Sequence, residues 1–163
     1  MTRLEVLITV NGETRGAYVE PRQTLADFLR DECALTGTHL GCEHGVCGAC
    51  TVMLDGVTVR SCLIFASQIR PDQSVVTIEG IASSDGSLSV VQQAFRDEFG
   101  LQCGFCTPGF VMAVTELLDH NPTPTRDEIV DALSGNLCRC TGYQGILRAV
   151  EHAARELAGG PGA

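Results

Sequence analysis

Apolar and polar residues alternate along the first part of the chain, which is the pattern of β-strands with one buried face. The alternation is clearest over residues 4–10, and Asn11-Gly12 follows directly. This dipeptide favours a two-residue hairpin turn, so a second strand is predicted through 17–19. The same pattern predicts three more strands, the first two joined by an Asp55-Gly56 turn, at 51–54, 57–61 and 75–78.

A short helix and a long irregular loop interrupt these strands. Thr24 is a suitable N-cap residue, Asp27 occupies the third helical position, and an apolar stripe runs from Leu25 to Leu29. Residues 35–50 contain four glycines and show no periodic pattern. We therefore expect a short helix from Leu25, followed by an extended loop.

From about residue 80, apolar residues recur at helical spacing instead. One helix is predicted over 88–99, before Gly100. A second is predicted over 107–120, with Thr107 as its cap and Pro108 in its first turn.

Two further helices complete the pattern. Thr125 and Glu128 form a capping box that opens a helix to about Leu133, and a last helix is predicted over 142–157. A strand-rich half followed by a helical half indicates an α+β protein with two small domains. We place these domains at 1–79 and 80–163. Because neither half can bury a large core, each would gain stability from a bound metal.

Charge and hydropathy exclude two classes of partner. The chain has 163 residues and a formal net charge of -9, whereas a nucleic-acid-binding protein needs a basic surface. No apolar run reaches the length of a membrane span. The first residues lead straight into a strand pattern without a signal peptide, so we expect a cytoplasmic protein.

Nine cysteines are the chemical feature that needs an explanation. They stand at positions 33, 42, 47, 50, 62, 103, 106, 138 and 140. Disulfides are not expected because the cytosol keeps thiols reduced, and buried structural thiols would not explain the short spacings. Two groups of four suit two four-coordinate metal sites, which leaves Cys33 to pack at the end of the first helix.

The first group has the spacing C-x4-C-x2-C, with a fourth cysteine eleven residues further on. This is the pattern of plant-type 2Fe–2S ferredoxins. Its four predicted ligands are Cys42, Cys47, Cys50 and Cys62. Glycines 41, 45 and 48 allow positive φ and close backbone approach, so that main-chain N–H groups can donate to the sulfurs of a cluster.

Two other metal sites fit the first group less well. Structural zinc sites consist of two short cysteine pairs, not of three cysteines on one glycine loop. The Cys42-x-His44 step hints at a Rieske site, but such a site needs a second histidine where Cys50 stands. The remaining histidines, His39, His120 and His152, show no ligand spacing and are expected at a surface or an interface.

The second group consists of two short pairs, each placed just before a predicted helix. Its predicted ligands are Cys103, Cys106, Cys138 and Cys140. Helix N-termini carry partial positive charge and free N–H groups, which stabilise an anionic centre. The spacing alone leaves zinc and iron–sulfur open at this site.

The two motifs together, GCEHGVCGAC…C and QCGFCTPG…GNLCRCTGYQ, resemble the iron–sulfur subunit of the molybdenum hydroxylase (xanthine oxidase) family. The resemblance covers about residues 3–157 and extends to the small subunit of bacterial aerobic carbon monoxide dehydrogenase. It implies a β-grasp ferredoxin domain followed by a four-helix domain, each holding one 2Fe–2S cluster. Cys42, Cys47, Cys50 and Cys62 would hold the cluster distal to molybdenum, and the second group the proximal one.

The resemblance also implies partner subunits, a large one that binds molybdenum–pterin in its cytosine dinucleotide form and a medium one that binds FAD. A dimer of heterotrimers is the implied assembly. Gln102 matches the family glutamine that reaches the pterin of the neighbouring subunit. No dinucleotide fingerprint and no nucleophile–base pair is found, so the chain is expected to be an electron-transfer component without a catalytic residue of its own.

Two rival functions stay open on the sequence. A stand-alone two-cluster ferredoxin would need no enzyme partner, although a separate helical domain is superfluous for a simple carrier. A zinc-stapled interaction module would contain zinc instead of iron and sulfide.

Overall fold

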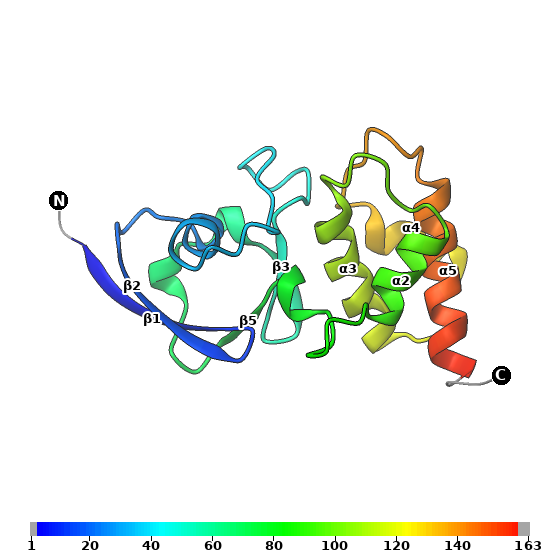
Figure 1. The fold of residues 1–163 in the computed structure, drawn as a ribbon. Coiled ribbons are helices and arrows are strands. Elements are labelled where there is room, and N and C mark those ends of the chain that lie inside the picture. The colour runs from blue at the N-terminus through cyan, green and yellow to red at the C-terminus, as the bar shows by residue number, and fades with distance from the viewer. Residues whose placement is uncertain (1–2, 160–163) are drawn as a thin grey trace.

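The structure is a computed structural model that describes residues 3–159. Its strand-rich half is one mixed sheet with the order β2-β1-β5-β3-β4 (Figure 1). The strands are β1 Leu4–Val10, β2 Glu13–Val19, β3 Thr51–Leu54, β4 Val57–Arg60 and β5 Ser74–Val76. Only the β1–β5 pairing is parallel among these strands, and a short helix packs on the sheet. This is the expected β-grasp arrangement.

The first hairpin is confirmed, whereas the last strand is shorter than predicted. Asn11 and Gly12 both take positive φ (51° and 81°), as the tight turn requires. β5 ends at Val76 because the next residue leaves the ladder: the N–H of Thr77 donates to Oδ1 of Asn11 over 2.9 Å. The predicted strand end at Ile78 is instead part of a 3₁₀ turn.

The first helix starts as predicted and ends unusually. Thr24 and Asp27 form the capping box of α1 (Leu25–Asp27), which continues as a π-helical turn over Phe28–Glu32. Cys33 follows that turn, donates its N–H to the carbonyl of Phe28, and packs half-buried against the core of the sheet half. Burial raises the pKa of the Cys33 thiol. Cys33 thus occupies the structural position expected for it.

The helical half contains α2 Val90–Asp97, α3 Thr107–His120, α4 Arg126–Leu133 and α5 Gln144–Gly159. The capping box of α4 is confirmed at Thr125 and Glu128. α2 is shorter than predicted because Ser89 and Gln92 form an unforeseen capping box at its start. Phe99 lies beyond the end of α2 and is 80% exposed.

Two predicted helix starts were wrong. Thr107 is not the cap of α3 but its first residue; Cys106 takes the capping position and makes no side-chain cap bond. α5 begins at Gln144 rather than at Gly142, because Gly142 and Tyr143 take left-handed conformations with φ of 61° and 68°.

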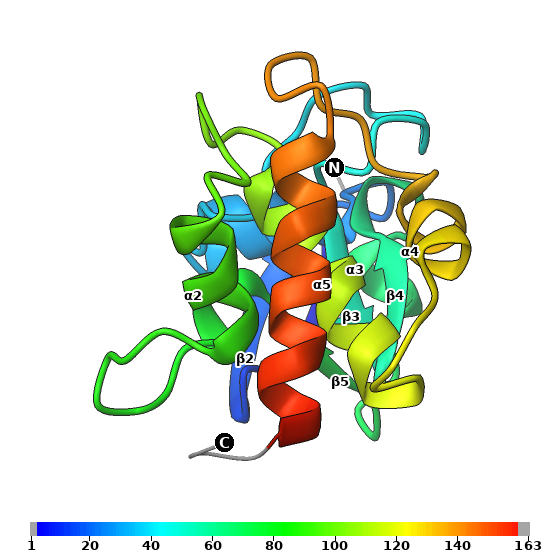
Figure 2. The same cartoon turned by 90° about the vertical axis from the view of Figure 1, so that its right-hand side faces the viewer.

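Each half has its own hydrophobic core. Phe95, Phe110 and Ile146 are among the buried residues between the helices, and Ile8 and Phe28 are among those between the sheet and the first helix. The halves meet where α3 packs against β3 (Figure 1). Figures 1 and 2 both show the loops 36–50, 100–106 and 134–143 at the same side of the molecule. In the described part of the chain, no helix has the length and apolar composition needed to cross a bilayer.

Candidate metal centres

The structure brings the first four cysteines together as two pairs of thiols. The N–H of Cys47 donates to Sγ of Cys42 over 3.3 Å. Cys50 and Cys62 form a second, buried pair at the junction of the loop with the β3–β4 hairpin. A Cβ on Gly45, between Cys42 and Cys47, would lie 2.5 Å from the side chain of Leu63, so the loop of the first pair lies against the residue next to Cys62.

The second four cysteines are arranged in the same way, although they come from two distant segments. Sγ of Cys103 and Sγ of Cys140 lie 3.5 Å apart. Cys106 and Cys138 form the other pair, at the hydrophobic core of the helical half. Each pair therefore takes one cysteine from the loop before α3 and one from the loop before α5.

Two thiol pairs per site suit a binuclear centre. In a 2Fe–2S cluster four protein ligands are shared between two irons, so each iron takes two. Within the described residues, no three Cys, His, Asp or Glu side chains are grouped so that they could hold one metal ion. All nine cysteines are free thiols in the structure.

The backbone favours thiolate at particular positions. Hydrogen bonds from the N–H groups of His44 and Cys47 lower the pKa of Cys42 to about 6. At Cys138 burial alone would raise the pKa, but the hydroxyl and N–H of Thr141 donate to its sulfur and lower it. Burial raises the pKa of Cys62 to about 11 and that of Cys106 to about 12, so these thiols stay protonated without a cation to replace the proton.

A buried hydroxyl beside the second site tests whether a cluster fits. Oγ1 of Thr107, the residue after Cys106, is buried and has no hydrogen-bond partner in the described chain. Such a donor is satisfied when an anionic sulfur lies next to it. The donor groups around both sets thus suit a negatively charged sulfur centre.

The three predicted loop glycines prove to have different neighbours. A Cβ on Gly41 would lie 3.1 Å from Sγ of Cys47, whereas one on Gly45 would meet the side chain of Leu63 at 2.5 Å. A Cβ on Gly48, which has φ of +74°, would meet the carbonyl oxygen of Gly135 at 2.6 Å. Gly48 thus faces the other half of the protein, a role that its spacing from the cysteines did not reveal.

The other predicted positions are all near the surface. Gln102 is exposed next to the exposed Cys103. His44 is exposed, and its Nδ1 is hydrogen-bonded to the carbonyl of Cys42. His39 stacks on Phe105 with ring centroids 4.8 Å apart, so it joins the two halves.

A hydrogen-bonded junction between the two cysteine sets was not predicted. The N–H of Leu137, next to Cys138, donates to the carbonyl of Cys47 over 2.9 Å. The side-chain amide of Asn136 donates to the carbonyl of Gly48 over 3.1 Å. Arg60 adds a bond of 2.7 Å to the carbonyl of Gly135. Asn136 stands inside the second motif and could have been noticed there, but Arg60 carries no sequence signal of its own.

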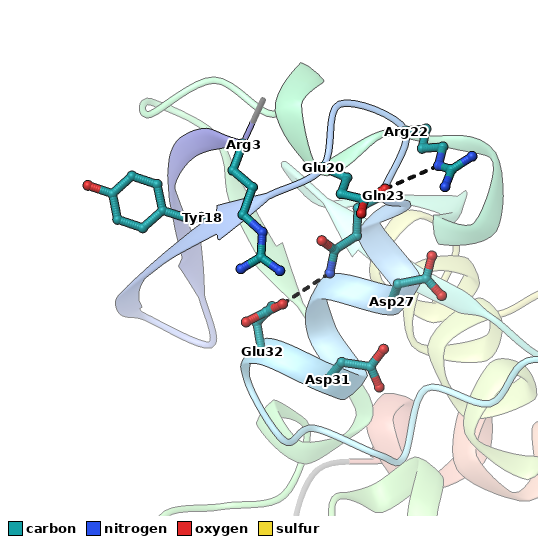
Figure 3. A pocket seen from close by; sticks show the side chains of 8 residues that line it. All are labelled: Arg3, Tyr18, Glu20, Arg22, Gln23, Asp27, Asp31 and Glu32. Atoms are coloured by element: carbon teal, nitrogen blue, oxygen red, sulfur yellow. Dashed lines mark hydrogen bonds and ion pairs between the residues drawn. The ribbon is translucent and has the colours of Figure 1, made fainter. Parts of the chain in front are cut away.

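A polar hollow elsewhere on the sheet half takes no part in these sites. Figure 3 shows its lining, which contains neither cysteine nor histidine. The lining residues are Arg3, Tyr18, Glu20, Arg22, Gln23, Asp27, Asp31 and Glu32. The cysteine sets lie instead at loops whose neighbouring apolar side chains are exposed, namely Val46, Leu63, Phe65, Leu101, Phe105 and Leu137.

Comparison with known proteins agrees with this geometry. A model of the 2Fe-2S iron-sulfur cluster binding domain matches residues 8–75, and a model of a [2Fe-2S] binding domain matches residues 77–151. The fold and the two cysteine sets therefore define a two-cluster iron–sulfur protein of the electron-transfer class.

Proteins that are similar over nearly the whole chain identify the family. The nicotine 6-hydroxylase small subunit of Paenarthrobacter nicotinovorans is 55% identical over 95% of this chain and 92% of its own. Caffeine dehydrogenase subunit gamma of Pseudomonas sp. (strain CBB1) is 52% identical over 90% of this chain and 88% of its own. A chain of quinoline 2-oxidoreductase from Pseudomonas putida 86 superposes with a TM-score of 0.91 at 44% identity, covering 98% of this chain and 99% of that one.

The chain thus belongs to the iron–sulfur small subunits of the molybdenum hydroxylases, which are electron-transfer subunits of oxidoreductase complexes. The resemblance stated on the two motifs is confirmed, as is the α+β fold. The zinc alternative for the second site is not supported, because both halves match 2Fe–2S domains.

Proposed function

We propose that this chain passes electrons singly from a molybdenum–pterin centre in a large subunit to FAD in a medium subunit. The observation that supports this route is the pairing of eight thiols into two sites that one hydrogen-bonded junction connects. A simple carrier would need only one such site. Two linked sites suit transfer across the width of a subunit.

We assign the ligands by set. Cys42, Cys47, Cys50 and Cys62 would hold the cluster distal to molybdenum, and Cys103, Cys106, Cys138 and Cys140 the proximal one. When bound, each 2Fe–2S cluster accepts and releases one electron. The chain holds the sulfurs, limits access of water through the buried pair Cys50–Cys62, and fixes the spacing of the two sites through the junction. Residues 1–79 and 80–163 are the proposed units for the two clusters.

The surface around each set supports docking of a separate partner. Val46, Leu63 and Phe65 are exposed beside the first set, and Leu101, Phe105 and Leu137 beside the second. Exposed apolar groups of this size are typical of protein contacts. Gln102 is exposed next to Cys103, and we assign it the role of reaching a pterin held by the large subunit. Glycines 41, 45 and 48 shape the first loop.

The finer assembly follows from the family. We propose a dimer of heterotrimers in the cytoplasm, with the pterin in its cytosine dinucleotide form. The names of the relatives, a nicotine hydroxylase, a caffeine dehydrogenase and a quinoline oxidoreductase, point to an N-heterocycle as the substrate of the large subunit. Carbon monoxide and aldehydes are the competing substrates.

Anaerobic reduction tests the route. The complex should contain about four irons and four sulfides per copy of this chain, and its two reduced clusters should give two distinct EPR signals. An N-heterocyclic substrate should reduce both clusters without added dithionite. Cys103→Ser should remove one signal and leave the other, and Cys62→Ser should do the reverse.

Purification separates the proposal from a stand-alone ferredoxin. Co-purification with two larger subunits at fixed stoichiometry supports the relay. A stable two-cluster monomer that soluble reductases reduce, and that no larger subunit accompanies, contradicts it.

A further inference from the structure

Arg60 stands between the two cysteine sets. It is the last residue of β4, two positions before Cys62, and its side chain is half-buried. Its Nη1 donates to Oγ1 of Thr51, next to Cys50, over 2.7 Å. Its Nη2 donates to the carbonyl of Gly135 over 2.7 Å and to Oδ1 of Asn136 over 3.3 Å. The guanidinium therefore touches segments that flank ligands of both sites.

All of these partners are neutral. Among the described residues no carboxylate lies within ion-pair distance of Arg60, although other arginines, such as Arg70 with Asp72, do have one. A half-buried cation normally has a counter-charge nearby, because removing it from water is costly. No negative side chain therefore contacts Arg60 directly.

The neighbouring acidic residue does not supply it directly. Glu116 lines the same hollow as Arg60, but its carboxylate accepts hydrogen bonds from the N–H and hydroxyl of Thr58. Arg30, another half-buried arginine, donates to the carbonyls of Thr36 and Thr38 and so borders the first loop alone. Among the described residues, Arg60 is the arginine that donates hydrogen bonds to residues near ligands of both sets.

We propose that Arg60 is a shared counter-cation for both clusters and raises the reduction potential of each. This inference rests on the proposed assignment of eight cysteines to two clusters. A cluster bound by four thiolates is anionic, and it gains one further negative charge when it accepts an electron. A fixed positive charge near it stabilises the reduced form more than the oxidised form. Because Arg60 lies between the sites, one side chain acts on both.

A redox titration of the purified complex, followed by the EPR signals of the two reduced clusters with dithionite as reductant, tests this role. In Arg60→Gln both clusters should become harder to reduce. At a given ambient potential the ratio of reduced to oxidised cluster should fall about tenfold, which is about 59 mV for a one-electron couple. Arg60→Lys keeps the charge but loses the forked hydrogen bonds, and it should stay within about twofold of the parent.

The matched control is Arg70→Gln, which removes the same charge from an exposed pair with Asp72. It should leave both potentials unchanged. If Arg60→Gln leaves both potentials unchanged, or if Arg60→Lys shifts them as far as Arg60→Gln does, Arg60 is only a structural link. If the parent complex lacks iron and sulfide, the proposed function itself fails, which is a different result.

A second variant tests the electrostatic role if Arg60→Gln does not retain its clusters. Glu116→Gln removes the opposing charge from the same hollow and keeps an acceptor for Thr58. Both clusters should then become easier to reduce, by about twofold to threefold in the same ratio. Unchanged or lowered potentials in this variant would overturn the electrostatic role.

Discussion

The two cysteine sets have the same paired geometry but are built by different means. The first is formed mainly by one loop, in which residues 36–47 make no backbone–backbone hydrogen bond with one another among the described contacts. The second is formed where the loops before α3 and α5 meet, and both of those helices belong to the core of the helical half. The first site is thus local in sequence and weakly ordered by its backbone. The second is distant in sequence and held by tertiary packing.

This contrast teaches where a bound cluster matters for folding. A loop without internal backbone–backbone hydrogen bonds gains its order mainly from ligand bonds, as in other small metal domains. Helices that bury Phe95, Phe110 and Ile146 between them should keep their order without a metal. The loops of the two sites should therefore respond unequally when the same kind of cofactor is removed.

Removal of iron and sulfide should produce the largest effect and should expose this inequality. Glu43 lies exposed in the first loop, and Arg139 lies exposed between the ligands of the second. After acid and chelator treatment, cleavage by a glutamyl endopeptidase after Glu43 should rise by about tenfold or more, because local opening becomes easy there. Tryptic cleavage after Arg139 should rise much less, because Tyr143 and α5 still hold that loop.

Mass spectrometry of the first fragments measures both rates, with the holo-protein as the control. Equal acceleration at Glu43 and Arg139 would contradict the difference between the sites. It would mean that the helical half also depends on its cluster for order.

The next effect should show how far the two sites depend on each other. Gly48→Val introduces a side chain where φ is +74° and the carbonyl oxygen of Gly135 would lie 2.6 Å from its Cβ. Strain and overpacking should together cost about 3 kcal/mol of folding free energy. Because the clash is with the second loop, both EPR signals should be lost or broadened, although Gly48 belongs to the first motif.

Gly56→Val is the matched control for this substitution. Gly56 has a similar φ of +83°, and a Cβ at this position would have nothing within 4 Å, so only the strain of about 1–2 kcal/mol remains. Both EPR signals should persist in it. Selective loss of the first signal in Gly48→Val, with the second intact, would show that the junction does not couple the sites.

Sequence reasoning succeeded where the signal was local. The Asn11-Gly12 turn and the capping boxes at Thr24 and Thr125 were predicted because neighbouring residues alone determine them. The prediction that Thr107 is an N-cap was wrong, because α3 begins at Thr107 itself and Cys106 takes the capping position. Sequence reasoning also failed at Gln144, because the left-handed φ of Tyr143 delays the helix by two residues.

The same distinction applies to the sites. The cysteines and their division into two sets were readable, since spacing and glycines are sequence properties. The thiol pairs within each set were not, because each pair in the second set joins segments more than thirty residues apart. The hydrogen bond from Arg60 to Gly135 could not be predicted either, because it depends on how the two halves pack.

Tyr143 offers a finer probe of how the second site is held. Its hydroxyl accepts the N–H of Cys138 over 2.9 Å and lies 3.5 Å from the carbonyl of Asn136. Its ring packs edge-on against the buried Phe110, with centroids 6.2 Å apart. The side chain thus connects a predicted cluster ligand to the helical core.

Tyr143→Phe should give the smallest effect, confined to the second site. It keeps the ring on Phe110 but leaves the N–H of Cys138 without its acceptor, at a cost of about 1 kcal/mol. The second cluster should lose iron to a chelator about fivefold faster, the factor that this free energy gives, while the first is unchanged. Tyr18 is 62% exposed, and Tyr18→Phe should alter neither rate. Equal acceleration at both clusters would mean that Tyr143 acts through the junction at Asn136, and the two sites would then share their support instead of being held by separate means.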